Sequence, residues 1–210
     1  MIETQSKEIQ KLYNMSNSVT VQDAMKLLNQ FDWDNFEEAP GKNKGKRGQA
    51  IELALGLTNN SSLLDLSDGE IKTFTQGQTI AVTQLNHCIP EIAAMVPFSQ
   101  SKVGLKIANT IYIAFTKNNE FITHKNQFSC LEIEQDYNHI THVIRGAIET
   151  GSKIGTISGP NGLLQIRTKA SKKKDGTYLP LVYNGHELNN KGMAFYLKGE
   201  YARKICRTTV

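Results

Sequence analysis

Four residues in the first half of the chain, Glu52, Asp65, Glu70 and Lys72, have types and a spacing that can carry chemistry. Glu70 and Lys72 lie two apart in a segment, 69–74, that predicts a strand, so their side chains project from the same face. Asp65 precedes this strand and can share a divalent cation with Glu70. Carboxylate oxygens suit Mg²⁺, and a neighbouring lysine suits an attacking water. The pattern is typical of a metal-dependent nuclease site.

Glu52 is expected on a helix over 49–55 that ends at Gly56. The apolar members of this helix leave Glu52 as the odd polar residue; they are Ile51, Leu53, Ala54 and Leu55. An acid within an apolar helical turn needs a partner or a metal. Acids and lysines are also common on exposed strands, so a solvated strand face is the alternative for Glu70 and Lys72.

Helical and strand-like patterns alternate along the chain. Predicted helices span 20–31, 49–55, 133–149 and 199–207, and predicted strands span 69–75, 78–85, 110–116, 121–123, 163–169 and 194–198. Thr20 is the expected N-cap of the first helix, and Gln76-Gly77 is expected to close a hairpin between the first two strands. We therefore expect an α/β (α+β) fold, a mixed central sheet flanked by helices, as one domain of two closely joined lobes.

Positive charge gathers in two tracts, although the net charge of the 210 residues is only +4. Lysines and arginines cluster over 42–47, directly before the helix that carries Glu52, and over 167–174. A phosphate backbone approaching the acidic residues would have to lie along the first tract. We expect Lys46 and Arg47 to contact such a backbone; Lys172 either contacts it or solvates a loop.

The remaining composition bears on location. No run of about 18 apolar residues exists to span a bilayer, so we expect no membrane association. The first residues are polar, without the apolar core of a secretory signal. The three cysteines, Cys88, Cys130 and Cys206, are far apart and odd in number, which favours free thiols and a cytoplasmic location.

Four segments, residues 45–56, 65–73, 164–170 and 195–198, carry a family resemblance. They resemble segments of the MutH-like DNA endonucleases, a family of the PD-(D/E)xK fold that includes a mismatch-repair enzyme and type II restriction enzymes. The resemblance implies double-stranded DNA as the partner. Residues 45–56 resemble the glycine-flanked helix that supplies the family's first acid, and 65–73 resemble its Asp-xn-Glu-x-Lys-Thr strand. Residues 164–170 are similar to its Leu-Gln-Ile-Arg-Pro-Lys-Ala stretch, and 195–198 to its Phe-Tyr-Leu-Lys hairpin. The resemblance implies one endonuclease domain over 1–210, with an N-terminal helical region to about 43, a catalytic core over about 44–135, and a long helix with DNA-recognition elements over 136–210.

The resemblance also assigns a catalytic set and a metal. The residues that match the family's catalytic positions are Glu52, Asp65, Glu70, Lys72 and Lys106. The implied ion is Mg²⁺, with Mn²⁺ as a substitute, and its implied ligands are Asp65, Glu70, the Ile71 carbonyl and Glu52. The spacer between Asp65 and Glu70 is four residues, shorter than in MutH.

Three further residues match the family's DNA-reading elements. Arg167 and Lys169 match positions on the base-reading loop, and Tyr196 matches a tyrosine near the adenine whose methylation is sensed. An arginine can read guanine through its forked donors, with a phosphate clamp as the alternative; Tyr196 can also be a packed hairpin aromatic. Family members recognise GATC, but Thr168 replaces a proline in the loop, so the site read here can differ.

These expectations combine into a function. We expect a sequence-specific, Mg²⁺-dependent DNA endonuclease, of the type II restriction kind at a short site such as GATC, acting as a monomer or homodimer. The first alternative is a mismatch-repair nicking endonuclease that needs a repair activator protein. The second, from another class, is a non-catalytic DNA-binding module.

Overall fold

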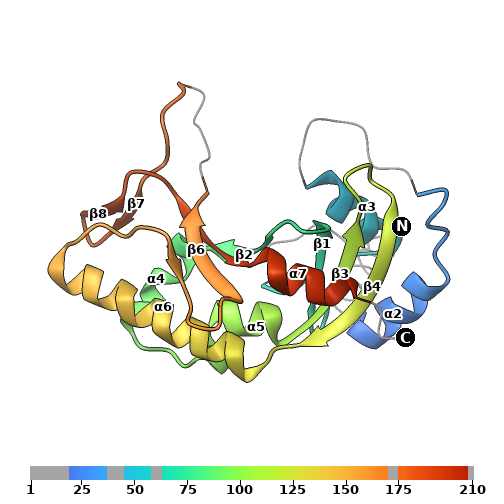
Figure 1. Ribbon diagram of the computed structural model, residues 1–210, viewed down its shortest axis with the longest axis horizontal. Coiled ribbons are helices and arrows are strands. Elements are labelled where there is room, and N and C mark those ends of the chain that lie inside the picture. Colours follow the sequence, from blue (N-terminus) through green and yellow to red (C-terminus); the bar gives the residue numbers. More distant parts are fainter. Residues whose placement is uncertain (1–18, 37–44, 58–62, 170–174, 208–210) are drawn as a thin grey trace, which may run out of the picture. The chain divides into compact units, whose positions relative to one another are not determined.

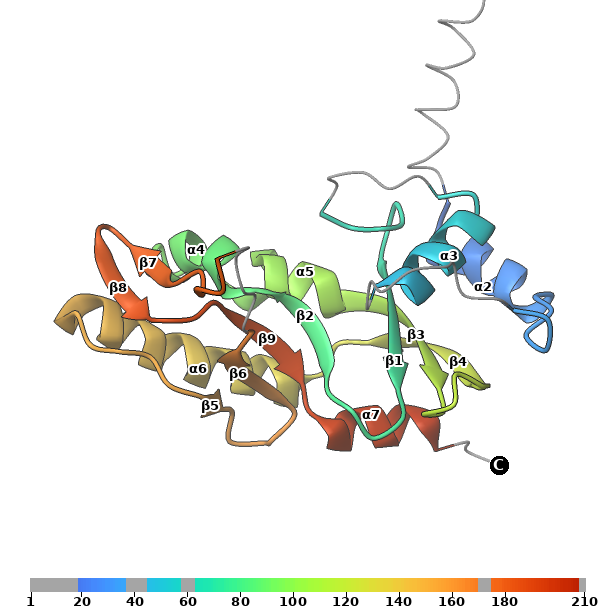
Figure 2. The same ribbon diagram turned by 90° about the horizontal axis from the view of Figure 1, so that it is seen from above.

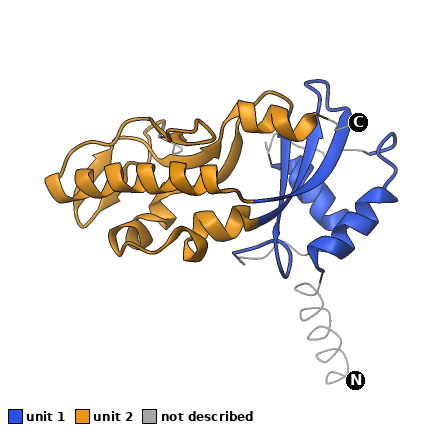
Figure 3. Ribbon diagram, turned by 60° about the horizontal axis from the view of Figure 1, so that its bottom comes forward, with its two compact units in different colours: residues 1–75, 109–128 blue, residues 76–108, 129–210 orange. Residues whose placement is uncertain are grey.

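The computed structural model describes residues 19–36, 45–57, 63–169 and 175–207. They divide into two compact units (Figure 3): unit 1 from within 1–75 and 109–128, and unit 2 from within 76–108 and 129–210. Each unit combines helices with strands, so the chain has a mixed α+β fold.

Unit 1 is built on a three-stranded sheet in the order β1-β3-β4 (Figure 2). Its strands are β1 (Glu70–Thr75), β3 (Asn109–Phe115) and β4 (Phe121–Phe128). The sheet is mixed, because β1 runs parallel to β3 and β4 runs antiparallel to it. The central strand β3 is buried from Thr110 to Phe115, as an apolar strand between two neighbours should be.

Two helices pack on this sheet, α2 (Val21–Asn29) and α3 (Lys46–Ala54). The predicted cap of α2 is confirmed, since Thr20 Oγ1 accepts a hydrogen bond from the Asp23 N–H at 3.1 Å. Helix α3 begins three residues before the predicted start, so Lys46 and Arg47 lie in its first turn and not in a loop. Leu53, one of the apolar members of this helix, is 66% exposed.

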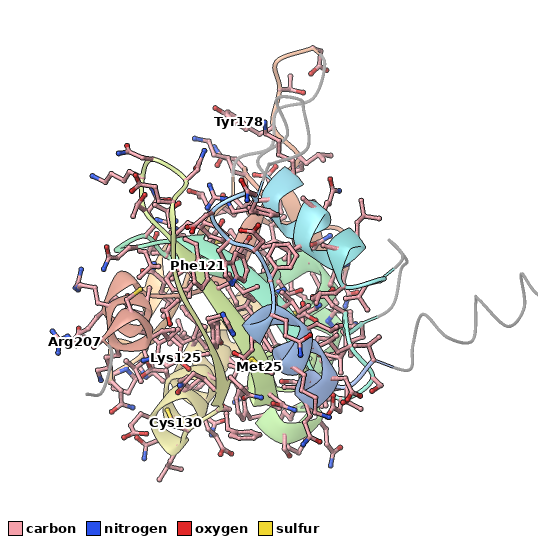
Figure 4. All side chains as sticks on the ribbon, turned by 90° about the vertical axis from the view of Figure 1, so that its right-hand side faces the viewer. Met25, Phe121, Lys125, Cys130, Tyr178 and Arg207 are labelled. Carbon is pink, nitrogen blue, oxygen red and sulfur yellow. The ribbon has the colours of Figure 1, made fainter. Side chains whose placement is uncertain are left out.

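An aromatic cluster attaches residues 31–36 to β3 and β4. The Trp33 and Phe121 rings stack with centroids 3.9 Å apart, and Phe36 lies against Phe115. Figure 4 labels Phe121 on β4. This packing holds the segment after α2 on the sheet of unit 1.

Unit 2 contains a four-stranded sheet in the order β2-β9-β6-β5, with every neighbouring pair antiparallel. The strands are β2 (Ile80–Gln84), β9 (Met193–Leu197), β6 (Leu164–Thr168) and β5 (Ile157–Ser158). The long helix α6 (Leu131–Thr150) packs against β6 and β5 (Figure 1).

The rest of unit 2 consists of short elements. Its other helices are α4 (Ile89–Ala93), α5 (Lys102–Ala108), α7 (Gly199–Cys206) and the 3₁₀ helices η1 (Leu85–His87) and η2 (Phe98–Gln100). A separate hairpin pairs β7 (Leu181–Tyr183) with β8 (His186–Asn189).

The hairpin expected between 69–75 and 78–85 is wrong. β1 pairs with β3 and β2 pairs with β9, so the two strands belong to different sheets. Gly77 has a positive φ of 78°, and a Cβ at Gly199 would lie 2.7 Å from the Gly77 carbonyl oxygen, so the turn packs on the start of α7. β1 and β2 bury their apolar side chains in different cores. The turn preference of Gln76-Gly77 could not reveal this.

Cys88, Cys130 and Cys206 are free cysteines. Burial raises the pKa of the Cys88 thiol to about 12, so this thiol stays protonated and unreactive. Among the helices of the described residues, none has the length and apolar composition to cross a bilayer.

Candidate functional site

Strand β1 presents Glu70 and Lys72 side by side, as the period of two along a strand predicts. Glu70 is 1% exposed, and its Oε1 forms an ion pair with Lys72 Nζ. Glu70 Oε2 accepts a hydrogen bond from the Asp65 N–H at 3.3 Å, and Asp65 Oδ2 accepts one from the Ile71 N–H at 3.1 Å. The two acids and the lysine therefore belong to one hydrogen-bonded set.

The start of β1 is fixed from both sides. Gly69 is buried, and a Cβ there would overlap the Asn109 carbonyl oxygen and the Val21 side chain, so only glycine fits between α2 and β3. From Glu70 onward β1 pairs with β3 in register, Glu70 opposite Thr110. Glu70 and Lys72 thus stand on a strand held by a buried central neighbour.

Glu52 reaches the same set from α3, which packs on β1. Gly48 lies between Glu52 and Thr73: a Cβ built there would be 3.7 Å from Glu52 Oε1 and 3.6 Å from Thr73 Oγ1. Burial raises the pKa of the Glu52 carboxyl, and the charges of Asp65 and Glu70 raise it further, while Lys72 acts in the opposite direction. Glu52 is close enough to the other acids to be affected by their charge.

A small pocket opens beside Glu52. Its volume is about 190 Å³, and it is lined by Gln49, Glu52, Leu53 and Leu57. Leu53 and Leu57 are its apolar lining residues, and Gln49 and Glu52 are its polar ones. The pocket is large enough for water beside Glu52.

The donor set of this cluster suits a hard divalent cation. Across 19–36, 45–57, 63–169 and 175–207, no three histidine, cysteine or acidic side chains are drawn together as a ready-made metal site. Asp65 and Glu70 still offer carboxylate oxygens within one hydrogen-bonded set, and their charges raise the pKa of Glu52. A cation relieves such repulsion, and oxygen ligands suit Mg²⁺. Asp65 and Glu70 are the residues that would hold it, with Glu52 as the third acid.

Three other predicted site residues, Ile71, Arg47 and Lys46, also lie in unit 1. The Ile71 side chain is buried in the core beneath β1. Arg47 lies over the Phe115 ring, with its guanidinium carbon 4.4 Å from the centroid, and donates a hydrogen bond to Asn119 in the turn before β4. Arg47 thus anchors α3 to the sheet, and Lys46 precedes it in the same turn.

The DNA-reading candidates lie in unit 2. Arg167 on β6 places its guanidinium 4.4 Å from the ring centroid of Tyr196 on β9, and its Nη2 donates to Thr79 Oγ1 at 2.6 Å. Lys169 is exposed just after β6, and its N–H donates to the Gly192 carbonyl at 2.7 Å. These contacts fix the end of β6 against two other strands.

The last two predicted site residues are Lys106 and Lys172. Lys106 is in the last turn of α5 in unit 2, where its charge lowers the pKa of Cys88, although burial dominates that thiol. Lys172 lies outside the described residues. The set that the structure brings together is therefore Glu52, Asp65, Glu70 and Lys72.

Two residues escaped the sequence analysis. Asp136 is fully buried on α6, and its carboxylate accepts hydrogen bonds from the backbone N–H groups of Asn161, Leu163 and Leu164 at 2.6 to 2.8 Å. An acid on the apolar face of a predicted helix was the signal that could have found it, as it found Glu52. Thr79, the partner of Arg167, carries no signal in its local sequence.

No family model matches this chain, and no curated protein sequence matches it either. The likeness to MutH-like endonucleases therefore rests on the four segments described above.

Proposed function

We propose that this protein is a Mg²⁺-dependent DNA endonuclease that hydrolyses phosphodiester bonds with residues of unit 1. The observation that carries the proposal is the hydrogen-bonded set of Asp65, Glu70 and Lys72, with Glu52 within electrostatic reach. Acids and a lysine held together at the start of a buried strand are the groups that phosphodiester hydrolysis needs.

Each of these residues has a chemical role. Mg²⁺, when bound by Asp65 and Glu70, supplies Lewis-acid stabilisation of the charge on the scissile phosphate. Lys72 orients the attacking water through its ammonium group and stabilises negative charge that develops on the phosphoryl oxygens. Glu52 accepts a hydrogen bond from a water in its pocket. Glu70 keeps Lys72 in place through their ion pair.

The proposal extends to the fold and the kind of enzyme. A mixed sheet whose strand carries an acid and a lysine two residues apart supports a restriction-endonuclease-like fold for unit 1. The resemblance of residues 164–170 and 195–198 to recognition segments supports a sequence-specific enzyme of the type II restriction kind at a short site. Arg167, Lys169 and Tyr196 are the proposed DNA-reading residues.

The experiment is plasmid cleavage by the purified protein. Supercoiled plasmid, prepared with and without adenine methylation, is incubated with the protein and either Mg²⁺ or a chelator, and product ends are sequenced. We expect linear product with uniform ends in Mg²⁺ and none with chelator. Nicking that appears only with a repair activator would support the mismatch-repair alternative. DNA that is bound but stays supercoiled in Mg²⁺ contradicts the proposal and favours a non-catalytic binding module.

A further inference from the structure

The guanidinium of Arg167 is held in one position by two neighbours. Its Nη2 donates to Thr79 Oγ1 at 2.6 Å, and its carbon lies 4.4 Å from the Tyr196 ring centroid. A cation over an aromatic face gains energy from the ring, and the hydrogen bond adds a direction. Together they fix both the height and the rotation of the guanidinium plane.

The sheet of unit 2 explains why these residues meet. β9 lies between β6 and β2, so the Arg167 side chain crosses β9 to reach Thr79, which immediately precedes β2. Tyr196 pairs with Gln165, two residues before Arg167, which places the tyrosine ring and the arginine on the same face. The arrangement uses three neighbouring strands of one sheet.

We propose that Thr79 is a positioning residue that, with Tyr196, orients the Arg167 guanidinium for readout of one base edge. This inference rests on the proposed function, because it assumes a DNA ligand. A guanidinium has five donors in one plane, of which the Thr79 bond uses one. The other donors keep the fork needed to meet two coplanar acceptors.

The fixed plane distinguishes base readout from a phosphate clamp. Two acceptors of a base edge, such as guanine O6 and N7, lie in one plane. They therefore bind a pair of donors more tightly when the orientation of that pair is fixed. A phosphate offers oxygens in several directions, and an arginine free to rotate serves it equally well. The threonine hydroxyl is therefore expected to govern selectivity more than overall affinity.

The first arm of the test observes the contact without DNA. Nitrogen-15 NMR of the free full-length protein reports whether rotation of the Arg167 guanidinium is restricted. We expect restricted rotation in the wild type, in Thr79→Ser and in the control Thr156→Val, which removes a hydroxyl from an exposed residue of the same unit. Thr79→Val should release the rotation at unchanged thermal stability. Free rotation in the wild type, or no change in Thr79→Val, overturns the positioning role.

The second arm measures base selectivity. Each variant selects binding sites from a pool of randomised duplexes, and the salt dependence of binding is measured on the preferred duplex. Thr79→Val should lower the preference at one base pair by about tenfold with an unchanged salt slope, and Thr79→Ser should restore it. A uniform loss across all sequences, or wild-type selectivity in Thr79→Val, overturns the readout role.

The two failures are distinguishable. A wild type that cuts plasmid in Mg²⁺, beside a Thr79→Val variant with unaltered selectivity, contradicts the role of Thr79 and leaves the nuclease intact. A wild type that neither selects nor cuts DNA contradicts the proposed function and the readout together, while the NMR arm still decides whether Thr79 positions Arg167.

Discussion

Glu70 in unit 1 and Asp136 in unit 2 are both buried acids, with 1% and 0% of their surface exposed, yet their surroundings are opposite. The Asp136 carboxylate is satisfied by three backbone N–H groups from the segment that leads into β6. Glu70 shares its oxygens between Lys72 and the Asp65 N–H, and its charge affects a third acid, Glu52.

Burial alone therefore does not mark an acid as functional. A buried carboxylate costs free energy unless its oxygens are hydrogen-bonded or paired. Asp136 meets this need with the chain's own backbone, and Gly159 packs so closely that a Cβ there would overlap the Asp136 side chain. Its oxygens are used to shape a loop. The acids around Glu70 leave a negative charge excess that a cation can offset.

Removing the loop-shaping acid should give the largest effect on stability. Asp136→Ala leaves three backbone N–H groups without their acceptor, so we expect the free energy of unfolding to fall by about 3 kcal/mol or more. Urea denaturation followed by circular dichroism measures this. Asn138→Ala, at an exposed position of the same helix, is the control. A change below about 1 kcal/mol in Asp136→Ala would contradict the structural role.

Neutralising Glu70 should reduce the cleavage rate more than it reduces stability. Glu70→Gln keeps the shape of the side chain but removes the charge that pairs with Lys72, so we expect the cleavage rate to fall about 100-fold or more. The loss of unfolding free energy should be smaller than in Asp136→Ala, because the neutral amide can still accept the Asp65 N–H hydrogen bond and no longer repels the charge of Glu52. Loss of stability as large as that in Asp136→Ala would erase the contrast between the two acids.

Mg²⁺ should stabilise unit 1 through its acids and leave the Asp136 site unaffected. At a Mg²⁺ concentration about tenfold above its Kd, we expect a gain of about 1.4 kcal/mol for the wild type. Asp65→Asn should lose most of this gain, and the exposed-acid control Glu120→Gln should keep it. Thermal unfolding with and without Mg²⁺ makes the measurement. An equal gain in all three proteins would place the ion elsewhere.

The smallest expected effect is the pH dependence of Glu52. Because the pKa of Glu52 is raised in the folded protein, its ionisation lowers stability progressively as the pH rises from the ordinary value of 4.5 through the raised pKa, and protonation restores that stability as the pH falls. Glu52→Gln should therefore be more stable than the wild type at neutral pH, by less than about 1 kcal/mol. The difference in stability should vanish below about pH 4.5, where the Glu52 carboxyl is protonated in both the folded and the unfolded protein. Stability that is lower in Glu52→Gln at neutral pH would contradict the charge repulsion.

Contacts between residues close together in the chain could be predicted from the sequence. The Thr20 cap and the meeting of Glu70 with Lys72 depend on neighbours within three residues, where helix and strand periodicity decides the geometry. The strand expected over 121–123 is confirmed for the same reason, and β4 is longer, from Phe121 to Phe128.

Long-range contacts were beyond such reasoning. The partner of β1 lies forty residues on, at Thr110, which the Gln76-Gly77 turn preference could not disclose. The donors to Asp136 are 25 to 28 residues away, and Thr79 is 88 residues from Arg167. Which distant residues pair depends on which apolar faces pack in the same core, and the local sequence pattern does not specify this.

The catalytic role of Lys72 is tested by the single-turnover rate at which Lys72→Ala cleaves plasmid in saturating Mg²⁺. Lys117→Ala, an exposed lysine in the turn of the same unit, is the matched control. We predict a rate about 100-fold or more below the wild type for Lys72→Ala, with DNA binding retained, and a wild-type rate for Lys117→Ala. Cleavage by Lys72→Ala at the wild-type rate would contradict the catalytic assignment.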